Sequence, residues 1–392
     1  MKKAKKIIVV FFVLTMVLAM TSCAKKQEEA HVHKIGVVVY SLQDEQVQAF
    51  REYLESYIAG NFTDVDFLYS SSVTSAEEEM EFLQNAVAEG VEGILAFNSY
   101  DLEKEVAFCA ENGVYFIRPS STTDENTFAK VENDPYFLGY FGPGNEMEYE
   151  AGYDMGSYFA QGKSSDSYFL LSGGASANVM HTQRTMGILD ALQEAYGVQF
   201  DMSSEEIAKT EEPLHVQAGD LKVCVFPGYV GEESTGQKAV EEFQKDEAGV
   251  VMGVIPVQKI AKSLGNASLG VIDCYTEQNG ELFKNGQLKY LSGKYESIIG
   301  PAFAAMYNAV TGYAEDFREN GHAFAIQQGF WTSTDYQDFQ KKYELSSGIT
   351  LNAYSYEDLL EVCKAHNEQA SLEDLKDLAG AWDFDSAVQR RN

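Results

Sequence analysis

The sequence predicts an α/β protein with two doubly wound parallel-sheet domains, followed by a C-terminal helical extension. Strand-length apolar runs alternate with segments of helical periodicity, and this alternation starts again after Gly142-Pro143-Gly144. Length agrees, because 392 residues exceed what a single domain usually holds. We therefore expect two separate cores, each built on a parallel sheet.

The N-terminal segment is typical of an export signal. Lysines precede the apolar run Ile7–Met20, and Thr21-Ser22-Cys23 follows it. The run is shorter than the roughly 20 residues of a membrane-spanning helix, which disfavours a transmembrane anchor. A cysteine at this junction resembles the signal of bacterial lipoproteins. That resemblance implies a signal peptide over 1–22, lipid attachment at Cys23 and a tether over 23–33.

The first half of the chain reads as repeated β–α units. Its apolar runs of strand length are 35–40, 65–69, 93–97 and 114–118. Amphipathic helical segments separate them at 43–59, 75–87 and 101–112. Ser75 with Glu78 has the spacing of a helix N-terminal capping box. Strands joined through helices in this way pair in parallel.

The second half repeats this order. Its predicted strands are 168–172, 222–226, 250–255, 269–273, 289–292 and 323–329. Its predicted helices are 147–159, 179–196 and the long segment 297–319. The last stretch, 333–392, is polar and mostly helical in pattern, and we expect it to form the extension.

Composition excludes several functions. Hydrophobic residues make up 45% of the chain, which excludes intrinsic disorder, and 60 acidic against 29 basic residues disfavour a nucleic-acid partner. The cysteines at 109, 224, 274 and 363 form no CxxC pair, so we expect free thiols. No nucleophile elbow and no zinc-protease motif occurs. We predict no cofactor, no metal site and no catalytic residue.

Five short matches, in order, resemble one known family. They are Lys34–Val38, Gly90–Leu95, Tyr149–Tyr153, Arg184-Thr185-Met186-Gly187 and Leu269–Asp273. Residues 34–330 are in this way similar to the type 1 periplasmic substrate-binding proteins, in particular to sugar-binding, ribose-receptor-like members. The resemblance implies two lobes joined by a three-stranded hinge, with a ligand held in the cleft between them.

The same resemblance implies interleaved domains. The N-terminal lobe takes 34–143 plus about 295–325, and the C-terminal lobe takes 144–294 plus about 326–332. The extension 333–392 lies beyond the region of resemblance, and we expect it to pack on the second lobe or at the rim of the cleft.

Candidate ligand contacts follow strands, because ligands of open α/β sheets bind beyond the carboxyl ends of strands. Tyr40, Asp44 and Asn98 follow strands of the first domain, although Asn98 also suits a plain turn. Asp273 ends a strand of the second domain, where it either contacts a ligand or caps the helix near Glu277.

Three basic side chains complete the candidate set. Arg184 begins a helix, where its guanidinium can donate to two ligand oxygens or pair with an acidic neighbour. His181 lies one turn earlier on the same helix face and is either a contact or a supporting residue. Lys294 stands where sugar-binding relatives tend to have glutamine; it suits an anionic ligand group or an ion pair with Asp44 or Asp273.

The chain departs from the family pattern in its aromatic residues. Sugar-binding relatives usually stack a pyranose on rings in the first helix, where this chain has Glu45-Gln46-Val47. Tyr40, Tyr229, Tyr275 and Trp331 are possible substitutes. This departure argues against a simple sugar, and the predicted ligand is a small polar molecule, either a sugar or a sugar-like compound.

These patterns together predict a lipid-anchored, extracytoplasmic solute-binding protein that serves an ABC-type importer, with a membrane permease as partner. The alternatives are a receptor that presents its ligand to a signalling protein and an exported hydrolase. If Arg184 is a charge-assisted contact, Arg184→Ala should weaken binding by about 1.5–3 kcal/mol without unfolding the protein.

Overall fold

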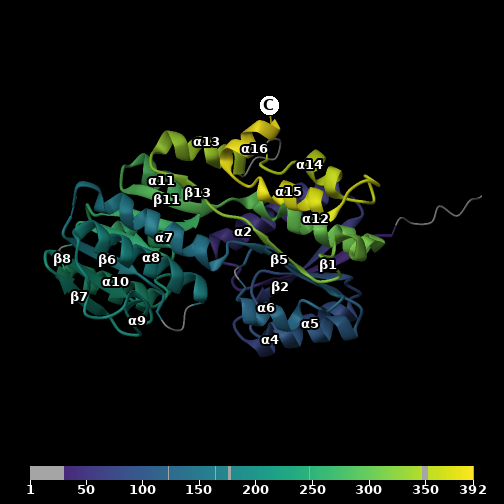
Figure 1. The fold of residues 1–392 in the computed structure, drawn as a ribbon, viewed down its shortest axis with the longest axis horizontal. Coiled ribbons are helices and arrows are strands. Elements are labelled where there is room, and N and C mark those ends of the chain that lie inside the picture. Colours follow the sequence, from purple (N-terminus) through teal and green to yellow (C-terminus); the bar gives the residue numbers. More distant parts are fainter. Residues whose placement is uncertain are drawn as a thin grey trace, which may run out of the picture. The chain divides into compact units, whose positions relative to one another are not determined.

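The computed structural model describes residues 31–121, 123–163, 165–174, 178–246, 248–346 and 352–391. The chain divides into two units, Met1–Val32 and His33–Asn392, and the second holds all the described strands. Those strands form one sheet of six and one sheet of seven (Figure 1). The predicted pair of parallel-sheet α/β domains is confirmed. The predicted signal peptide and Cys23 lie outside the described residues.

The first sheet is parallel throughout and has the order β12-β5-β4-β3-β1-β2. Its strands are β1 (His33–Val39), β2 (Val65–Ser72), β3 (Gly93–Ala96), β4 (Tyr115–Arg118), β5 (Phe137–Gly142) and β12 (Phe324–Gln327). The central strands are apolar on both faces, and every residue of β3 is buried. Both faces of a parallel sheet are covered by helices, which explains why these runs are continuously apolar rather than alternating.

The helices of the first lobe start at polar caps. They are α2 (Glu45–Glu52), continued by a π-helical stretch (Tyr53–Ile58) and α3 (Ala59–Asn61), then α4 (Ala76–Ala88), α5 (Leu102–Glu111), α6 (Glu125–Val131) and α12 (Gly300–Asn308). Asp44, Ser75, Asp101 and Asp124 cap α2, α4, α5 and α6 by accepting backbone N–H groups. Each cap therefore fixes where a strand-to-helix loop ends.

The second sheet has the order β13-β11-β10-β9-β6-β8-β7, parallel inside and antiparallel at both edge pairs. Its strands are β6 (Ser167–Leu171), β7 (Leu214–Ala218), β8 (Leu221–Phe226), β9 (Val250–Gly253), β10 (Ser268–Cys274), β11 (Leu288–Lys294) and β13 (Trp331–Ser333). Its helices are α7 (Asn145–Ala160), α8 (Val179–Tyr196), α9 (Ser204–Ala208), α10 (Glu233–Asp246) and α11 (Glu277–Lys284). The four cysteines of the described residues are buried free thiols, as predicted.

Strand β5 was absent from the sequence prediction, because its glycines resemble a loop. Gly139 and Gly142 have φ of 136° and 144°, a region that other residues rarely adopt. A Cβ at Gly142 would lie 2.5 Å from the carbonyl oxygen of Ser121. Glycine is needed here so that the end of β5 can pass close to the loop that follows β4.

The long helix predicted over 297–319 is wrong in its C-terminal half. Helix α12 ends at Asn308, and a π-helical stretch (Ala309–Tyr313) and a 3₁₀ turn (Ala314–Phe317) follow it. Gly312 has φ of 95°, which interrupts regular helix geometry. The apolar periodicity continues past this break, so the pattern alone does not reveal it.

The chain passes between the two sheets after β5, after β11 and after β12. Strand β12 stays in the first sheet as far as Gln327, two residues beyond the predicted crossing near 325. The predicted boundaries of the lobes near residues 143, 294 and 325 correspond to these three crossings. The exact bounds of the lobes stay a prediction.

The C-terminal extension packs on both lobes rather than on the second lobe alone. It forms α13 (Tyr336–Ser346), α14 (Tyr356–Val362), α15 (Leu372–Gly380) and α16 (Phe384–Arg391). Helix α13 lies against α11, whereas α14 and α15 cover α12 (Figure 1). Among the described residues, no helix is both long and apolar enough to cross a membrane.

Candidate functional site

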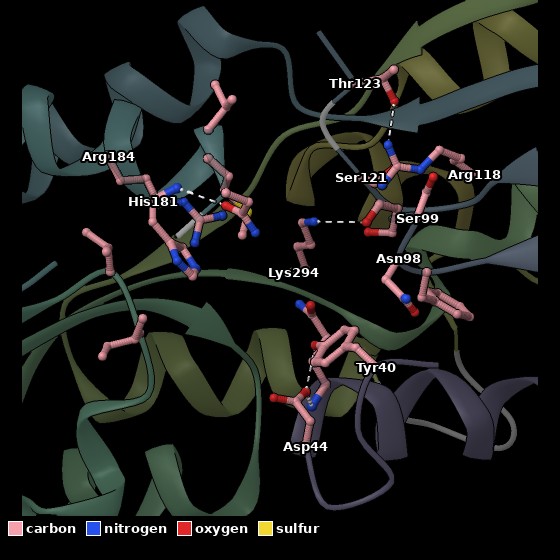
Figure 2. Close-up of a pocket in the computed structure, with 18 of the residues that line it drawn as sticks. Tyr40, Asp44, Asn98, Ser99, Arg118, Ser121, Thr123, His181, Arg184 and Lys294 are labelled. Atoms are coloured by element: carbon pink, nitrogen blue, oxygen red, sulfur yellow. Dashed lines mark hydrogen bonds between the residues drawn. The ribbon is translucent and has the colours of Figure 1, made fainter. Parts of the chain in front are cut away.

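A cavity of about 890 Å³ lies at the carboxyl ends of strands from both sheets. This volume is within the range of small-molecule binding sites. The predicted ligand contacts all line it, and Figure 2 labels each of them except Asp273: Tyr40, Asp44, Asn98, His181, Arg184, Asp273 and Lys294. These residues lie together because parallel strands run in the same direction, so their carboxyl ends, and the residues that follow them, lie at the same edge of the sheet.

Arg184 on α8 lines the cavity and forms a buried ion pair with Glu148. Its Nε donates to Oε2 of Glu148 on α7 at 2.5 Å, and the two side chains are 5% and 0% exposed. Glycines bring the helices together: a Cβ at Gly152 would lie 1.9 Å from the carbonyl oxygen of Arg184. The guanidinium also lies over the ring of Phe330 at 5.2 Å. Its Nη1 also donates to the carbonyl oxygen of Ile272 at 3.5 Å, so Arg184 is a buried cation in the cavity lining that protein groups hold in place.

This ion pair corrects the expectation that Arg184→Ala leaves the fold intact. The sequence offered no signal for Glu148 as the partner, because 36 residues separate the two. Removing the guanidinium leaves a carboxylate in a site with no exposure, which is strongly destabilising.

Asp273 is a partly buried acceptor at the end of β10. Its Oδ2 accepts from Nε2 of Gln258 at 2.7 Å and from Nδ2 of Asn279 at 3.4 Å. The alternative that Asp273 caps the next helix is wrong, because Thr276 is the N-cap of α11. Burial raises the pKa of Asp273 to about 6, and the two amide hydrogen bonds only partly oppose that rise.

This pKa predicts how Asp273 affects stability. Because the folded-state pKa exceeds the ordinary value, the penalty for ionising Asp273 is absent below about pH 4 and complete above about pH 6. We expect Asp273→Asn to raise the free energy of unfolding of the ligand-free protein by about 1–3 kcal/mol at pH 7.5, and to have no such effect at pH 4. Thermal unfolding at the two pH values measures this.

The control is Asp201→Asn, because Asp201 is exposed and this substitution removes a carboxylate charge that is not buried. In Asp273→Asn, the new side-chain amide can still be hydrogen-bonded. The buried Oε1 of Gln258 has no partner among the described residues, and it can accept from the NH₂ group of the new asparagine if the Gln258 amide rotates by about 180°. An equal change in melting temperature at both pH values would contradict the assigned pKa.

Asp44 has both a structural and a cavity-facing role. As N-cap of α2, its Oδ1 accepts from the backbone N–H of Gln46 and Val47, and also from the hydroxyl of Tyr40 at 2.9 Å. Burial raises the pKa of Asp44, and these hydrogen bonds oppose the rise. Burial raises the pKa of Tyr40 well above its ordinary value, so its hydroxyl stays protonated. Because Oδ1 already accepts three hydrogen bonds, we expect Asp44 to contact a ligand through Oδ2.

Asn98 presents its carbonyl oxygen rather than its amide nitrogen. Its Nδ2 donates to Oε1 of Glu79 at 3.4 Å, and its buried Oδ1 has no partner among the described residues. Burial and a hydrogen bond with Glu105 raise the pKa of Glu79 to about 9, so Glu79 is protonated at neutral pH. Backbone N–H groups of Tyr100 and Asp101 also bond this carboxyl pair. Asn98 therefore contributes to the cavity lining an amide oxygen that the described residues do not use.

His181 is neutral at physiological pH. Burial and the nearby Arg184 cation lower its pKa to about 3. Its buried Nδ1 has no hydrogen-bond partner among the described residues. The ring therefore offers the cavity a hydrogen-bonding group without a charge.

Lys294 pairs with neither Asp44 nor Asp273, contrary to one alternative from the sequence. Its only hydrogen bond within the described residues joins Nζ to the carbonyl oxygen of Ser120 at 3.4 Å, across the cavity. Burial, followed by the cations Arg184 and Arg118, lowers the pKa of Lys294 to about 8, although Glu148 acts in the opposite direction. Lys294 is 4% exposed.

Several cavity residues were not among the leading sequence candidates. Arg118 ends β4, and its Nη1 donates to the hydroxyl of Thr123 at 2.9 Å. Ser99 and Ser121 line the cavity with buried hydroxyls that have no partner in the described part of the chain. The sequence could have indicated these residues, because each lies at the end of a predicted strand or shortly after it.

The aromatic substitutes divide between cavity and core. Tyr40 and Tyr229 line the cavity, and Tyr229 is 42% exposed. Tyr275 instead stacks on Phe339 with ring centroids 5.3 Å apart, and Trp331 stacks on Tyr295 at 3.8 Å. Neither Tyr275 nor Trp331 reaches the cavity, so only part of the expected aromatic surface is available to a ligand.

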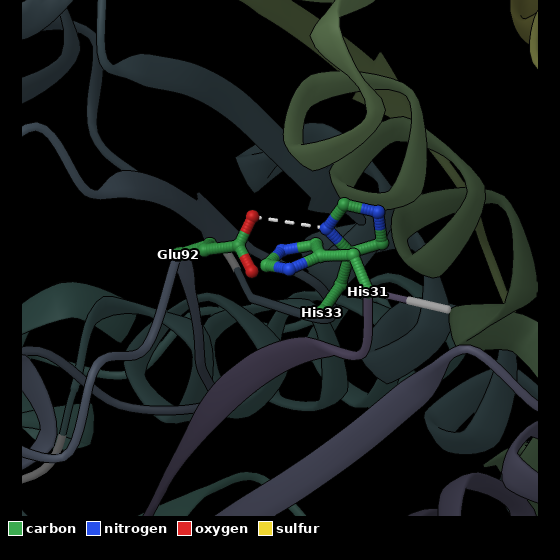
Figure 3. Close-up of side chains that lie close together, drawn as sticks. All are labelled: His31, His33 and Glu92. Atoms are coloured by element: carbon green, nitrogen blue, oxygen red, sulfur yellow. Dashed lines mark hydrogen bonds and ion pairs between the residues drawn. The ribbon is translucent and has the colours of Figure 1, made fainter. Parts of the chain in front are cut away.

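Histidine clusters lie outside the cavity. His33 belongs to β1 rather than to the predicted tether, and its Nδ1 lies 2.9 Å from Oε2 of Glu92 (Figure 3). Elsewhere, His215 Nε2 lies 2.9 Å from Oε1 of Glu242 and 3.8 Å from Sγ of Cys224. Lys245 also bonds Glu242, at 2.6 Å. Protein groups alone satisfy these contacts, and we assign them no metal.

Comparison with known proteins finds similarity only at the level of structure. No protein-family model matches the sequence, and no curated protein matches it significantly. A galactofuranose binding protein is similar with a TM-score of 0.59 and 11% identity, covering 81% of this chain and 99% of its own.

Two further solved structures give the same result. A carbohydrate transporter from Acidothermus cellulolyticus, in complex with myo-inositol, has a TM-score of 0.58 and 16% identity over 82% of this chain and 99% of its own. The periplasmic binding component of the arabinose ABC transporter from Shewanella has a TM-score of 0.55 and 12% identity over 79% and 94%. At such identities the likeness establishes the fold. The chain has the type 1 periplasmic binding protein fold, with two parallel-sheet α/β domains and a polar cavity at the ends of their strands.

Proposed function

We propose that the protein is an extracytoplasmic solute-binding protein that captures a small polar ligand, a sugar or a sugar-like compound, for an ABC-type importer. The observation that carries the proposal is the cavity, because one small-molecule site is lined by strand ends from both sheets. The solved structures with this fold support it, since they include a galactofuranose binding protein and an arabinose transporter component.

The proposed ligand contacts are the polar side chains of the cavity. Asp44, Asn98 and Asp273 supply acceptors for hydroxyl groups, and Arg184 and Lys294 supply charged donors. Tyr40 and His181 complete the set. No covalent step is required, because a ligand held by both lobes stabilises the conformation in which they are closed.

A thermal-shift screen of residues 24–392 tests the proposed function. The panel contains monosaccharides, oligosaccharides, nucleosides, amino acids and short peptides. Ligand at one hundred times its dissociation constant stabilises the folded state by about 2.7 kcal/mol, and we expect such a shift for sugars. Asp273→Ala should reduce the shift and Asp201→Ala should retain it. No shift from any compound, with the protein folded, would contradict a solute-binding role.

We further propose that the protein is anchored to the membrane by lipid at Cys23. The proposal rests on the sequence before and at this cysteine, which lies outside the described residues. Metabolic labelling with a fatty-acid analogue should label the wild type and not Cys23→Ala. Equal labelling of both would refute the anchor.

A further inference from the structure

Lys294 is a buried cation that forms no ion pair with any of the described residues. Its side chain enters the cavity from the end of β11, and it is 4% exposed. Among the described residues it forms no ion pair within 4.0 Å, and its hydrogen bond to the Ser120 carbonyl is long, at 3.4 Å. A buried ammonium without a paired anion is unfavourable, so this arrangement favours a partner from outside the chain.

The other two cations of the cavity each act with carboxylates of the chain. Arg184 is ion-paired with Glu148 at 2.5 Å. Burial lowers the pKa of Arg118, and attraction to the charges of Glu105 and Asp124 opposes that decrease. Glu148 also attracts Lys294, but Arg184 already neutralises that carboxylate. Among these three cations, Lys294 is the one for which the described residues supply no carboxylate of its own.

Donors from the first lobe face this lysine. Figure 2 shows Lys294 directed across the cavity toward Ser121 and Arg118. Both residues line the cavity, and the Nε of Arg118 and the Oγ of Ser121 are buried without hydrogen-bond partners in the described part of the chain. An ammonium, a guanidinium N–H and a hydroxyl together suit the two oxygens of a carboxylate.

Asp124 lines the cavity near Arg118, whereas two other carboxylates of the cavity, Asp273 and Asp44, act on each other. Asp273 interacts with Asp44 and Glu45, and each of these charges raises its pKa. These acceptors suit hydroxyl hydrogens and repel a second carboxylate. The cavity thus has a cationic side around Lys294 and an anionic side around Asp273, so a ligand with one acidic end is bound in one direction.

We infer that the ligand is an acidic sugar, whose carboxylate is bound by Lys294, Arg118 and Ser121 and whose hydroxyls face Asp273 and Asp44. This inference rests on the proposed function and specifies its substrate class. A carboxylate carries a single charge and matches the single uncompensated lysine. A phosphate monoester carries about 1.5 to 2 negative charges at neutral pH and exceeds what the cavity balances.

Calorimetry with matched sugars tests the inference. The pairs are D-glucuronate with D-glucose and D-galacturonate with D-galactose, which differ only in a carboxylate at carbon 6. We expect the acid of at least one pair to bind at least tenfold more tightly than its neutral counterpart at pH 7. D-Glucose 6-phosphate is the third arm, and we expect it to bind less tightly than the carboxylate.

The variant Lys294→Met removes the charge and keeps the length of the side chain. It should abolish the preference for the acid, measured as the ratio of the dissociation constants of the neutral sugar and the acid. The matched control is Lys262→Met, an exposed lysine of the same lobe, which should keep the preference. Thermal unfolding of ligand-free Lys294→Met verifies folding, and its melting temperature should not decrease, because the substitution removes an uncompensated buried charge.

A proton-linkage measurement gives a second readout. The pKa of Lys294 is about 8, and a bound carboxylate raises it, so binding of the acid at pH 8 should take up a fraction of a proton. The charged groups that act on Lys294 are Glu148, Arg184, Arg118 and Cys274, and burial keeps the pKa of Cys274 well above its ordinary value. Calorimetry in buffers of different ionisation enthalpy measures this uptake, which Lys294→Met should lose.

The outcomes separate the two proposals. Tighter binding of the neutral sugar, or equal binding, overturns the acidic-sugar inference and leaves the solute-binding function standing. Tighter binding of glucose 6-phosphate overturns the assignment of a carboxylate. Unchanged preference in Lys294→Met removes the role of this lysine. Absence of binding by every sugar, with the protein folded, overturns the proposed function itself.

Discussion

Arg184→Met is expected to lower the free energy of unfolding by about 3–5 kcal/mol, because it removes the cation that neutralises a fully buried carboxylate. Glu148 has no exposure, and Arg184 donates to it at 2.5 Å. Methionine preserves much of the packing volume against Phe330, so the loss reports mainly the charge. Urea unfolding of the wild type and the variant, followed by circular dichroism, measures the difference.

The double variant Arg184→Met/Glu148→Gln is the control for this prediction. Removing both charges should recover most of the stability, since a neutral pair needs no compensation. A double variant as unstable as Arg184→Met would assign the loss to packing instead of to the buried charge. A single variant within about 1 kcal/mol of wild type would show that the pair contributes little.

Leu359→Ala is expected to cost about 2–5 kcal/mol, as for other fully buried leucines. Leu359 is unexposed on α14 of the extension, and a Cβ at Gly300 of α12 would lie 3.3 Å from its Cδ2. Polar contacts tie the same region together, because Nδ2 of Asn308 donates to the carbonyl of Val362 at 2.8 Å. The extension therefore contributes to the core of the first lobe.

Glu373→Ala is the matched control within the extension, because this side chain on α15 is exposed. It should change the free energy of unfolding by no more than about 0.5 kcal/mol. Chemical denaturation compares the two variants. A loss for Leu359→Ala as small as that of Glu373→Ala would mean that the extension is not part of the cooperative fold.

The extension also contacts the segments that cross between the lobes. The carbonyl oxygen of Trp382 accepts from the hydroxyl of Tyr295 at 2.8 Å and from Nε1 of Trp331 at 2.9 Å. Tyr295 follows β11 and Trp331 begins β13, so both lie where the chain passes from one sheet to the other. Nothing in the pattern of 333–392 predicted this position, because the partners are far away in sequence.

The amino-acid sequence predicted much of the architecture because strands of parallel sheets have a local signature. Their continuous apolar runs are required wherever helices cover both faces. Strand β5 and the end of the segment 297–319 were missed because Gly139, Gly142 and Gly312 have positive φ, which the apolar pattern does not reveal. Gly139 and Gly142 also lie against Phe324 and Ser121, which are distant in sequence. Such neighbours are brought together only by the fold.

The position of the site was also available from the sequence. Asp44, Asn98, Asp273 and Lys294 lie at the ends of strands or just after them, and the strands of a parallel sheet end at one edge. The electrostatic state of these side chains was not available. Whether a charge is neutralised depends on distances of a few ångströms between residues distant along the chain.

The sequence by itself determined the α/β class, the two sheets and the edge at which polar side chains gather, because these depend on periodicity along the chain. Only the tertiary structure decided that Arg184 is neutralised by Glu148 while Lys294 is not, and that the extension completes the first lobe. Burial and charge pairing are properties of neighbours in space, and local sequence does not encode those neighbours.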